Sequence, residues 1–85
     1  MDLDDLFVRY FGTADLAQVS PAVRAAGIGR LRVEFGLATD RGRRFALWAL
    51  LHMLGEAPDL DVAFKEESDR EAARNLMDLL SAGET

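Results

Sequence analysis

Residues 40–54 read DRGRRFALWALLHML, the strongest secondary-structure signal in the chain. After the arginines at its start, almost every position of this segment is apolar, and His52 is the one polar side chain in its second half. A helix that is apolar nearly all round has to be covered on several sides. We therefore expect residues 40–54 to form the central helix of the protein, capped by Thr39 or Asp40 and ended by Gly55.

Two shorter helices are expected before this segment. Residues 3–11 place apolar side chains at i, i+3, i+4, i+7 and i+8, which is one face of a helix. Ser20 followed by Pro21 marks a second start, because serine caps a helix and proline fits its first turn. We expect this second helix to cover residues 21–26 and to end at Gly27.

Residues 28–35 fit a helix and a strand equally well. Ile28, Leu31 and Phe35 have helical spacing, whereas Leu31, Val33 and Phe35 alternate as they would in a strand. No partner strand is visible elsewhere, and a lone strand cannot satisfy its backbone hydrogen bonds. We therefore predict a helix for residues 28–35.

The C-terminal third predicts a short turn and one more helix. Pro58 and Asp59 start the turn, and Ser68 with Glu71 forms the S-x-x-E pattern of a capping box before a helix over residues 69–81. Its expected inner face comprises Ala72, Ala73, Leu76, Met77, Leu79 and Leu80. The prediction for the whole chain, residues 1–85, is a single all-α domain. Four to five short helices would pack as a compact bundle around the central helix.

Charge is segregated along the chain. Residues 16–55 carry six arginines against two acids, a net charge of +4. Residues 1–15 carry four acids and one arginine, and residues 56–85 carry nine acids against three basic residues. The chain therefore has a basic middle between acidic ends, with a formal net charge of −5.

The basic middle offers a candidate anion site made of Arg30, Arg32, Arg41, Arg43 and Arg44. The last three lie in the first turn of the expected central helix, where positive charge opposes the helix dipole. Guanidinium groups and backbone N–H groups that converge there would bind a phosphate or a carboxylate. The alternative, which we favour, is that the protein's own acids neutralise these arginines.

A second reading of the basic middle is nucleic-acid binding. Residues 21–35 resemble a weak helix-turn-helix, with a turn at Gly27 and with Arg30 and Arg32 on the second helix. DNA-binding domains are usually basic as a whole, whereas this chain is acidic. Nucleic-acid or phosphate-ligand binding is therefore kept as the alternative function.

The sequence offers no group of residues suited to catalysis. It has no cysteine, and His52 is its only histidine, with no acid at helical spacing beside it. Metal sites need several such ligands, often paired along a helix. No nucleotide-binding loop or nucleophile motif is present. We expect no catalytic residue, no metal and no cofactor, and hence no enzyme.

Composition favours a protein-interaction module instead: a small regulator, accessory subunit or homo-oligomer. Hydrophobic residues make up 49% of the chain, and so small a domain has little interior in which to bury them. Some are therefore expected at the surface, as part of a contact site. The alternative, of equal weight, is that the surplus consists of alanine and glycine, which cost little when exposed. We expect Tyr10 and Phe11 to belong to the contact site. The partner would be another protein or a second copy, most simply in a dimer.

In one variant of this hypothesis, the basic middle of one copy faces the acidic C-terminal third of another.

The N-terminus, MDLDDLF, lacks the basic region of a signal peptide, and no apolar run is long enough to cross a bilayer. We therefore expect a cytoplasmic protein without a membrane partner. The strong preference for arginine over lysine is typical of high-GC bacteria.

Overall fold

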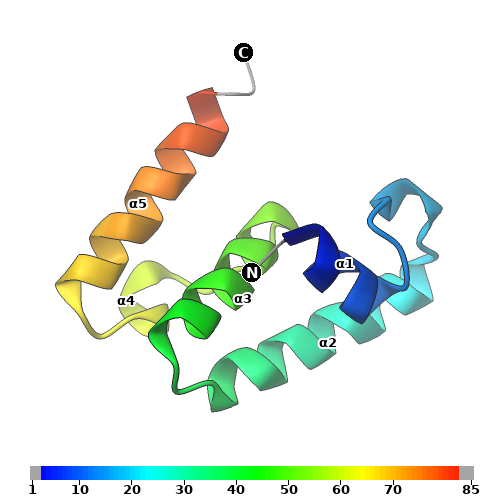
Figure 1. Ribbon diagram of the computed structural model, residues 1–85, viewed down its shortest axis with the longest axis horizontal. Helices are drawn as coiled ribbons and strands as arrows, with labels where there is room; N and C mark the ends of the chain where they lie inside the picture. The colour runs from blue at the N-terminus through cyan, green and yellow to red at the C-terminus, as the bar shows by residue number, and fades with distance from the viewer. Residues whose placement is uncertain (1–2, 83–85) are drawn as a thin grey trace.

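The computed structural model describes residues 3–82, and every regular element in that range is helical. The elements are α1 (Leu3–Phe11), a short 3₁₀ turn (Leu16–Gln18), α2 (Pro21–Leu37), α3 (Arg41–Met53), α4 (Leu60–Ala63) and α5 (Glu67–Ala82) (Figure 1). The predicted all-α class is confirmed. Residues 28–35 are helical, as predicted, and no strand occurs between residues 3 and 82.

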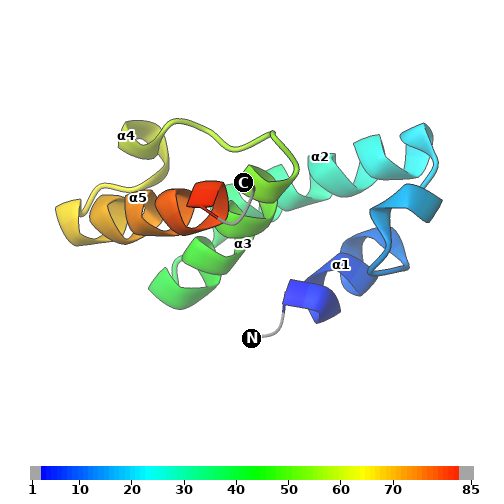
Figure 2. The same ribbon diagram turned by 90° about the horizontal axis from the view of Figure 1, so that it is seen from above.

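Helix α3 is the central helix, as its apolar sequence predicts. It contacts α1, α2 and α5, and α4 and α1 lie on opposite sides of it when the molecule is seen from above (Figure 2). Five consecutive residues of α3, from Leu47 to Leu51, are buried, and Trp48 is 1% exposed. The surrounding buried side chains from α1, α2 and the C-terminal third join them in one hydrophobic core.

Both ends of α3 follow from local chemistry. The Asp40 carboxylate accepts a hydrogen bond from the backbone N–H of Arg43 at 2.8 Å, which satisfies one of the free donors at the helix start. At the other end Gly55 has a φ of 75°, and the N–H of Glu56 donates to the carbonyl of Leu51 at 2.9 Å. This is the Schellman arrangement that glycine favours after a helix.

Helix α2 corrects the prediction of two short segments separated at Gly27. It is one continuous helix of 17 residues, so the helix-turn-helix predicted over residues 21–35 has no turn. Gly27 is required for a different reason. A Cβ atom there would lie 2.3 Å from the ring of Phe11 and 2.9 Å from the carbonyl oxygen of Tyr10. The absent side chain lets α1 cross closely over α2.

Helix α5 also begins earlier than predicted. Its first residue is Glu67, so Ser68 lies in the first turn and does not cap the helix. The Ser68 hydroxyl instead accepts a hydrogen bond from Arg41 at 3.2 Å. Four of the six predicted inner residues of α5 are buried or half-buried, whereas Ala72 and Leu79 are exposed. The C-terminal end of α5 extends away from α1, α2 and α3 (Figure 1).

Candidate functional site

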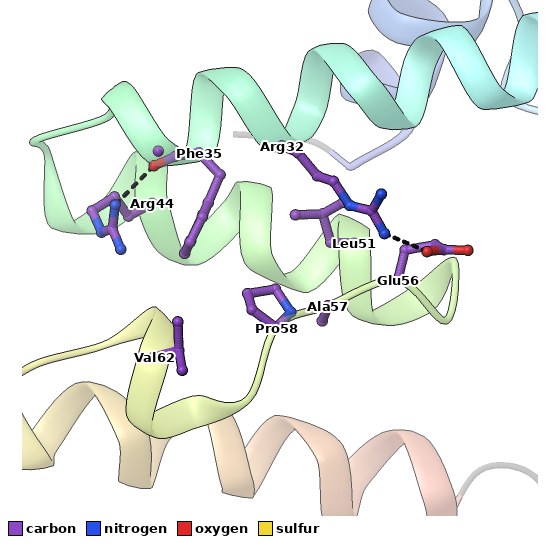
Figure 3. Close-up of a pocket in the computed structure, with 9 residues that line it drawn as sticks. Arg32, Phe35, Arg44, Leu51, Glu56, Ala57, Pro58 and Val62 are labelled. Atoms are coloured by element: carbon purple, nitrogen blue, oxygen red, sulfur yellow. Dashed lines mark hydrogen bonds and ion pairs between the residues drawn. The ribbon is translucent and has the colours of Figure 1, made fainter.

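Three of the five arginines of the predicted anion site form ion pairs within the chain. Arg41 lies 2.7 Å from the Asp69 carboxylate, and Arg43 lies 3.6 Å from that of Glu34. Arg32 pairs with Glu56 across the gap between α2 and the loop that follows α3 (Figure 3). The hydrogen bond from Arg41 to Asp69 raises the pKa of the Arg41 guanidinium. The protein's own acids thus neutralise much of the basic middle.

Arg44 has a structural role instead of an ionic one. Its guanidinium donates to the carbonyl oxygens of Phe35 at 2.8 Å and Ala38 at 3.3 Å, and also to that of Ala63. It also lies over the Phe35 ring, 4.2 Å from the centroid (Figure 3). Phe35 lies in the last turn of α2 and Ala38 directly follows the helix, where carbonyl oxygens are not fully satisfied by the helix itself. Arg44 therefore fastens the end of α2 to α3 and α4.

Arg30 is the remaining member of the predicted cluster. Its guanidinium lies 5.3 Å from the ring centroid of Tyr10, and it has no ion pair within residues 3–82. Residues two apart on a helix point to opposite sides, so Arg30 and Arg32 flank α2. The five arginines engage separate partners on several elements.

The two aromatic residues predicted to form a partner surface are buried. Tyr10 is 4% exposed and Phe11 is 5% exposed, because α1 turns both rings onto α2 where Gly27 leaves room. The Tyr10 hydroxyl and Glu34 Oε2 are also buried, without a hydrogen-bond partner in the described part of the chain. Burial raises the pKa of Tyr10, and the neighbouring Glu34 carboxylate raises it further.

A groove of about 540 Å³ lies between α2, the loop after α3 and α4 (Figure 3). Its lining residues are Arg32, Phe35, Gly36, Arg44, Leu51, Glu56, Ala57, Pro58 and Val62. The lining is mostly apolar, and its charged groups are two guanidiniums and one carboxylate. Arg32 and Glu56 pair with each other, and Arg44 donates to backbone carbonyls.

His52 and the other metal-ligating side chains are dispersed. His52 stacks on Trp48, with the ring centroids 5.2 Å apart. Among residues 3–82 no three side chains of the histidine, cysteine, aspartate or glutamate type come together as they would around a metal ion. Within the same range, no helix has the length and apolar character needed to span a bilayer.

The outward face of α2 is the surface that sequence reasoning missed. Its residues are all exposed and none is charged: Ala22, Ala25, Ala26, Gly29, Val33, Gly36 and Leu37. Val33 is 62% exposed and Leu37 is 75% exposed. The signal is a run of small and apolar residues at spacings of three and four. Splitting the segment at Gly27 concealed it.

A hollow of about 450 Å³ lies on this outward face. It is lined by Ala26, Gly29, Arg30, Val33 and Glu34. Gly29 leaves it open, because nothing lies within 4 Å of the place where a Cβ atom would be.

No known protein family matches the chain, and comparison with curated proteins and with solved structures finds no match. What the chain does must therefore be inferred from its own surfaces.

Proposed function

We propose that this chain is a small protein-interaction module of the bacterial cytoplasm, without catalytic activity, which binds its partner through the outward face of α2. The observation that carries the proposal is the absence of charge from that exposed face. The free side of a surface helix normally carries charged and polar residues. In α2 the charged residues lie beside this face and not on it, so an apolar strip stays exposed where α1 and α3 do not cover the helix.

The glycines of α2 support the proposal. Gly27 is required by the crossing of α1, but nothing lies within 4 Å of a Cβ atom at Gly29 or at Gly36. Each glycine inside a helix costs about 1 kcal/mol relative to alanine. No contact within 4 Å requires glycine at these two positions in the single chain. They allow the backbone of another molecule to approach α2 closely.

Binding of nucleic acid or of a phosphate ligand through the arginines is the alternative function. It has weaker support, because Arg32, Arg41 and Arg43 already pair with acids of the chain and Arg44 donates to backbone carbonyls. Its test is binding to duplex DNA at low salt, with an affinity that falls steeply as salt rises. The absence of binding at low salt would remove it.

Two exposed leucines provide a matched test of the proposed function. Leu37 on the outward face is 75% exposed, and Leu79 on α5 is 71% exposed. Leu37→Glu and Leu79→Glu therefore change equally accessible side chains in the same way. We expect Leu37→Glu to abolish association, whether with a second copy or with another protein retained from cells, and Leu79→Glu to preserve it.

The measurements are molar mass by light scattering and retention of proteins on the immobilised chain. Circular dichroism of each variant checks that it is folded. The proposal would be wrong if the native chain associated with nothing, or if Leu37→Glu kept every association of the native chain.

A further inference from the structure

We propose that the outward face of α2 binds the same face of a second copy, in an antiparallel helix pair whose two-fold axis passes close to Val33. This inference rests on the proposed function and names the partner.

Three residues of this face form a ridge that suits such a pair. Gly29, Val33 and Leu37 follow one another at four-residue intervals. Ridges of this spacing interdigitate when two helices cross at about −50°, with their axes about 8–10 Å apart. Val33 lies midway, about 6 Å along the axis from each of the other two. A copy turned about Val33 therefore brings its Leu37 opposite Gly29 of the first.

The two ends of this ridge, Leu37 and Gly29, are complementary in shape. Leu37 is 75% exposed and lies in the last turn of α2, whereas Gly29 lines the hollow of about 450 Å³. The two-fold axis makes the contact reciprocal, because each copy contributes one leucine and one hollow. Each leucine would leave water, and each hollow would be filled.

Charge at the rim of the hollow is complementary in the same register. Arg30 and Glu34 both line the hollow and are one helical turn apart. The antiparallel arrangement about Val33 places Arg30 of one copy close to Glu34 of the other, and it does so twice. Arg30 has no ion pair in the described range. Glu34 already lies 3.6 Å from Arg43 through Oε1, so Arg30 of the second copy would join an existing ion pair.

Cysteine cross-linking tests this register directly, since the chain has no cysteine of its own. Two helices whose axes are 8–10 Å apart bring residues at the crossing point to about 5 Å between Cα atoms, within the range of a disulfide. Val33→Cys should therefore form a covalent homodimer under mild oxidation. Leu79→Cys, equally exposed on α5, is the control for random collision and should stay monomeric.

A mixing experiment tests the antiparallel direction. Gly29→Cys alone and Leu37→Cys alone should not cross-link, because like residues lie on opposite sides of the axis. An equimolar mixture of the two variants should yield the mixed dimer. Sedimentation equilibrium should show a homodimer for the native chain and at least a tenfold loss of affinity for Leu37→Glu, with Leu79→Glu unchanged.

The outcomes separate this inference from the proposed function. A native chain that stays monomeric at millimolar concentration overturns the second-copy proposal, yet a protein whose retention is lost with Leu37→Glu would still support the interaction module. A dimer that cross-links through Leu79→Cys and not through Val33→Cys overturns the pairing of α2 helices. A native chain that neither forms a dimer nor retains another protein would overturn both proposals.

Discussion

Gly27 and Gly29 of α2 differ in what surrounds them, although the sequence presents them alike. At Gly27 an added methyl group would meet the Phe11 ring and the backbone of Tyr10. At Gly29 it would meet nothing within 4 Å. We expect Gly27→Ala to lower the free energy of unfolding by about 1–3 kcal/mol through overpacking, and Gly29→Ala to raise it by about 0.5–1 kcal/mol through helix propensity.

Urea unfolding at low protein concentration measures both variants of this pair without a contribution from association. Equal stability of the two variants would contradict the close crossing of α1 and α2.

Tyr10 predicts a dependence of stability on alkaline pH. It is the only tyrosine of the chain, and its pKa is raised above 10.0, first by burial and then by Glu34. Above pH 10 the unfolded chain loses the phenolic proton while the folded chain keeps it. The folded state then binds more protons, so stability falls as pH rises through this window.

Absorbance titration of the phenolate should give a midpoint above 10 in the folded protein and close to 10 in denaturant. Tyr10→Phe should flatten the part of the stability profile that belongs to this group. A folded-state midpoint at or below 10 would show that the hydroxyl is solvated.

At the scale of elements, helix α5 is the most weakly held of the long helices. Ala73 is its one buried residue among the described ones, and its start is fixed by the contact of Arg41 with Ser68 and Asp69. Elements with little buried apolar surface open locally at low free energy. We expect amides of α5 near Leu79 to exchange with solvent much faster than those of Leu47–Leu51 in α3.

Hydrogen exchange followed by NMR measures this difference residue by residue. Equal protection in α5 and α3 would mean that α5 unfolds only with the whole molecule.

The bounds of a helix could be predicted where residues close in sequence set them, and could not where contacts with distant residues set them. The cap at Asp40 and the glycine stop at Gly55 depend on residues one turn away, so the bounds of α3 were close to correct. The continuity of α2 through Gly27 depends on α1 crossing at that point. The periodicity of residues 21–35 cannot predict that crossing, and Gly27 by itself indicated a turn.

The candidate site shows the same limit. The sequence predicted that the chain's own acids would neutralise the arginines, but it could not predict which acids. Two of the pairs, Arg32 with Glu56 and Arg41 with Asp69, join residues 24 and 28 positions apart. Burial of Tyr10 and Phe11 follows from the angle at which α1 packs, which their own spacing does not fix. The outward face of α2 emerged only once the helix was continuous.

At the scale of the whole molecule, the segregated charges meet within one chain. The basic middle folds against the acidic C-terminal third through Arg32 and Arg41, so these charges are not left over for a second copy. What remains between two copies is the repulsion of two chains with a net charge of −5 each. Salt screens that repulsion, whereas it weakens an ionic contact.

The sign of the salt effect therefore identifies the force that joins two copies. For the apolar pairing of α2 helices, we expect the dimer affinity to stay constant or to rise up to about threefold as ionic strength increases from about 0.05 to 0.5 M. The Arg30–Glu34 pairs at the rim oppose this trend only slightly, because ion pairs near the surface contribute about 0–1 kcal/mol. Sedimentation equilibrium at the two ionic strengths gives the answer, with Leu37→Glu as the monomeric reference.

A tenfold loss of affinity at the higher ionic strength would instead place the contact between the basic middle and the acidic third of separate copies. The internal ion pairs of Arg32 and Arg41 would then have to exchange partners when two copies meet.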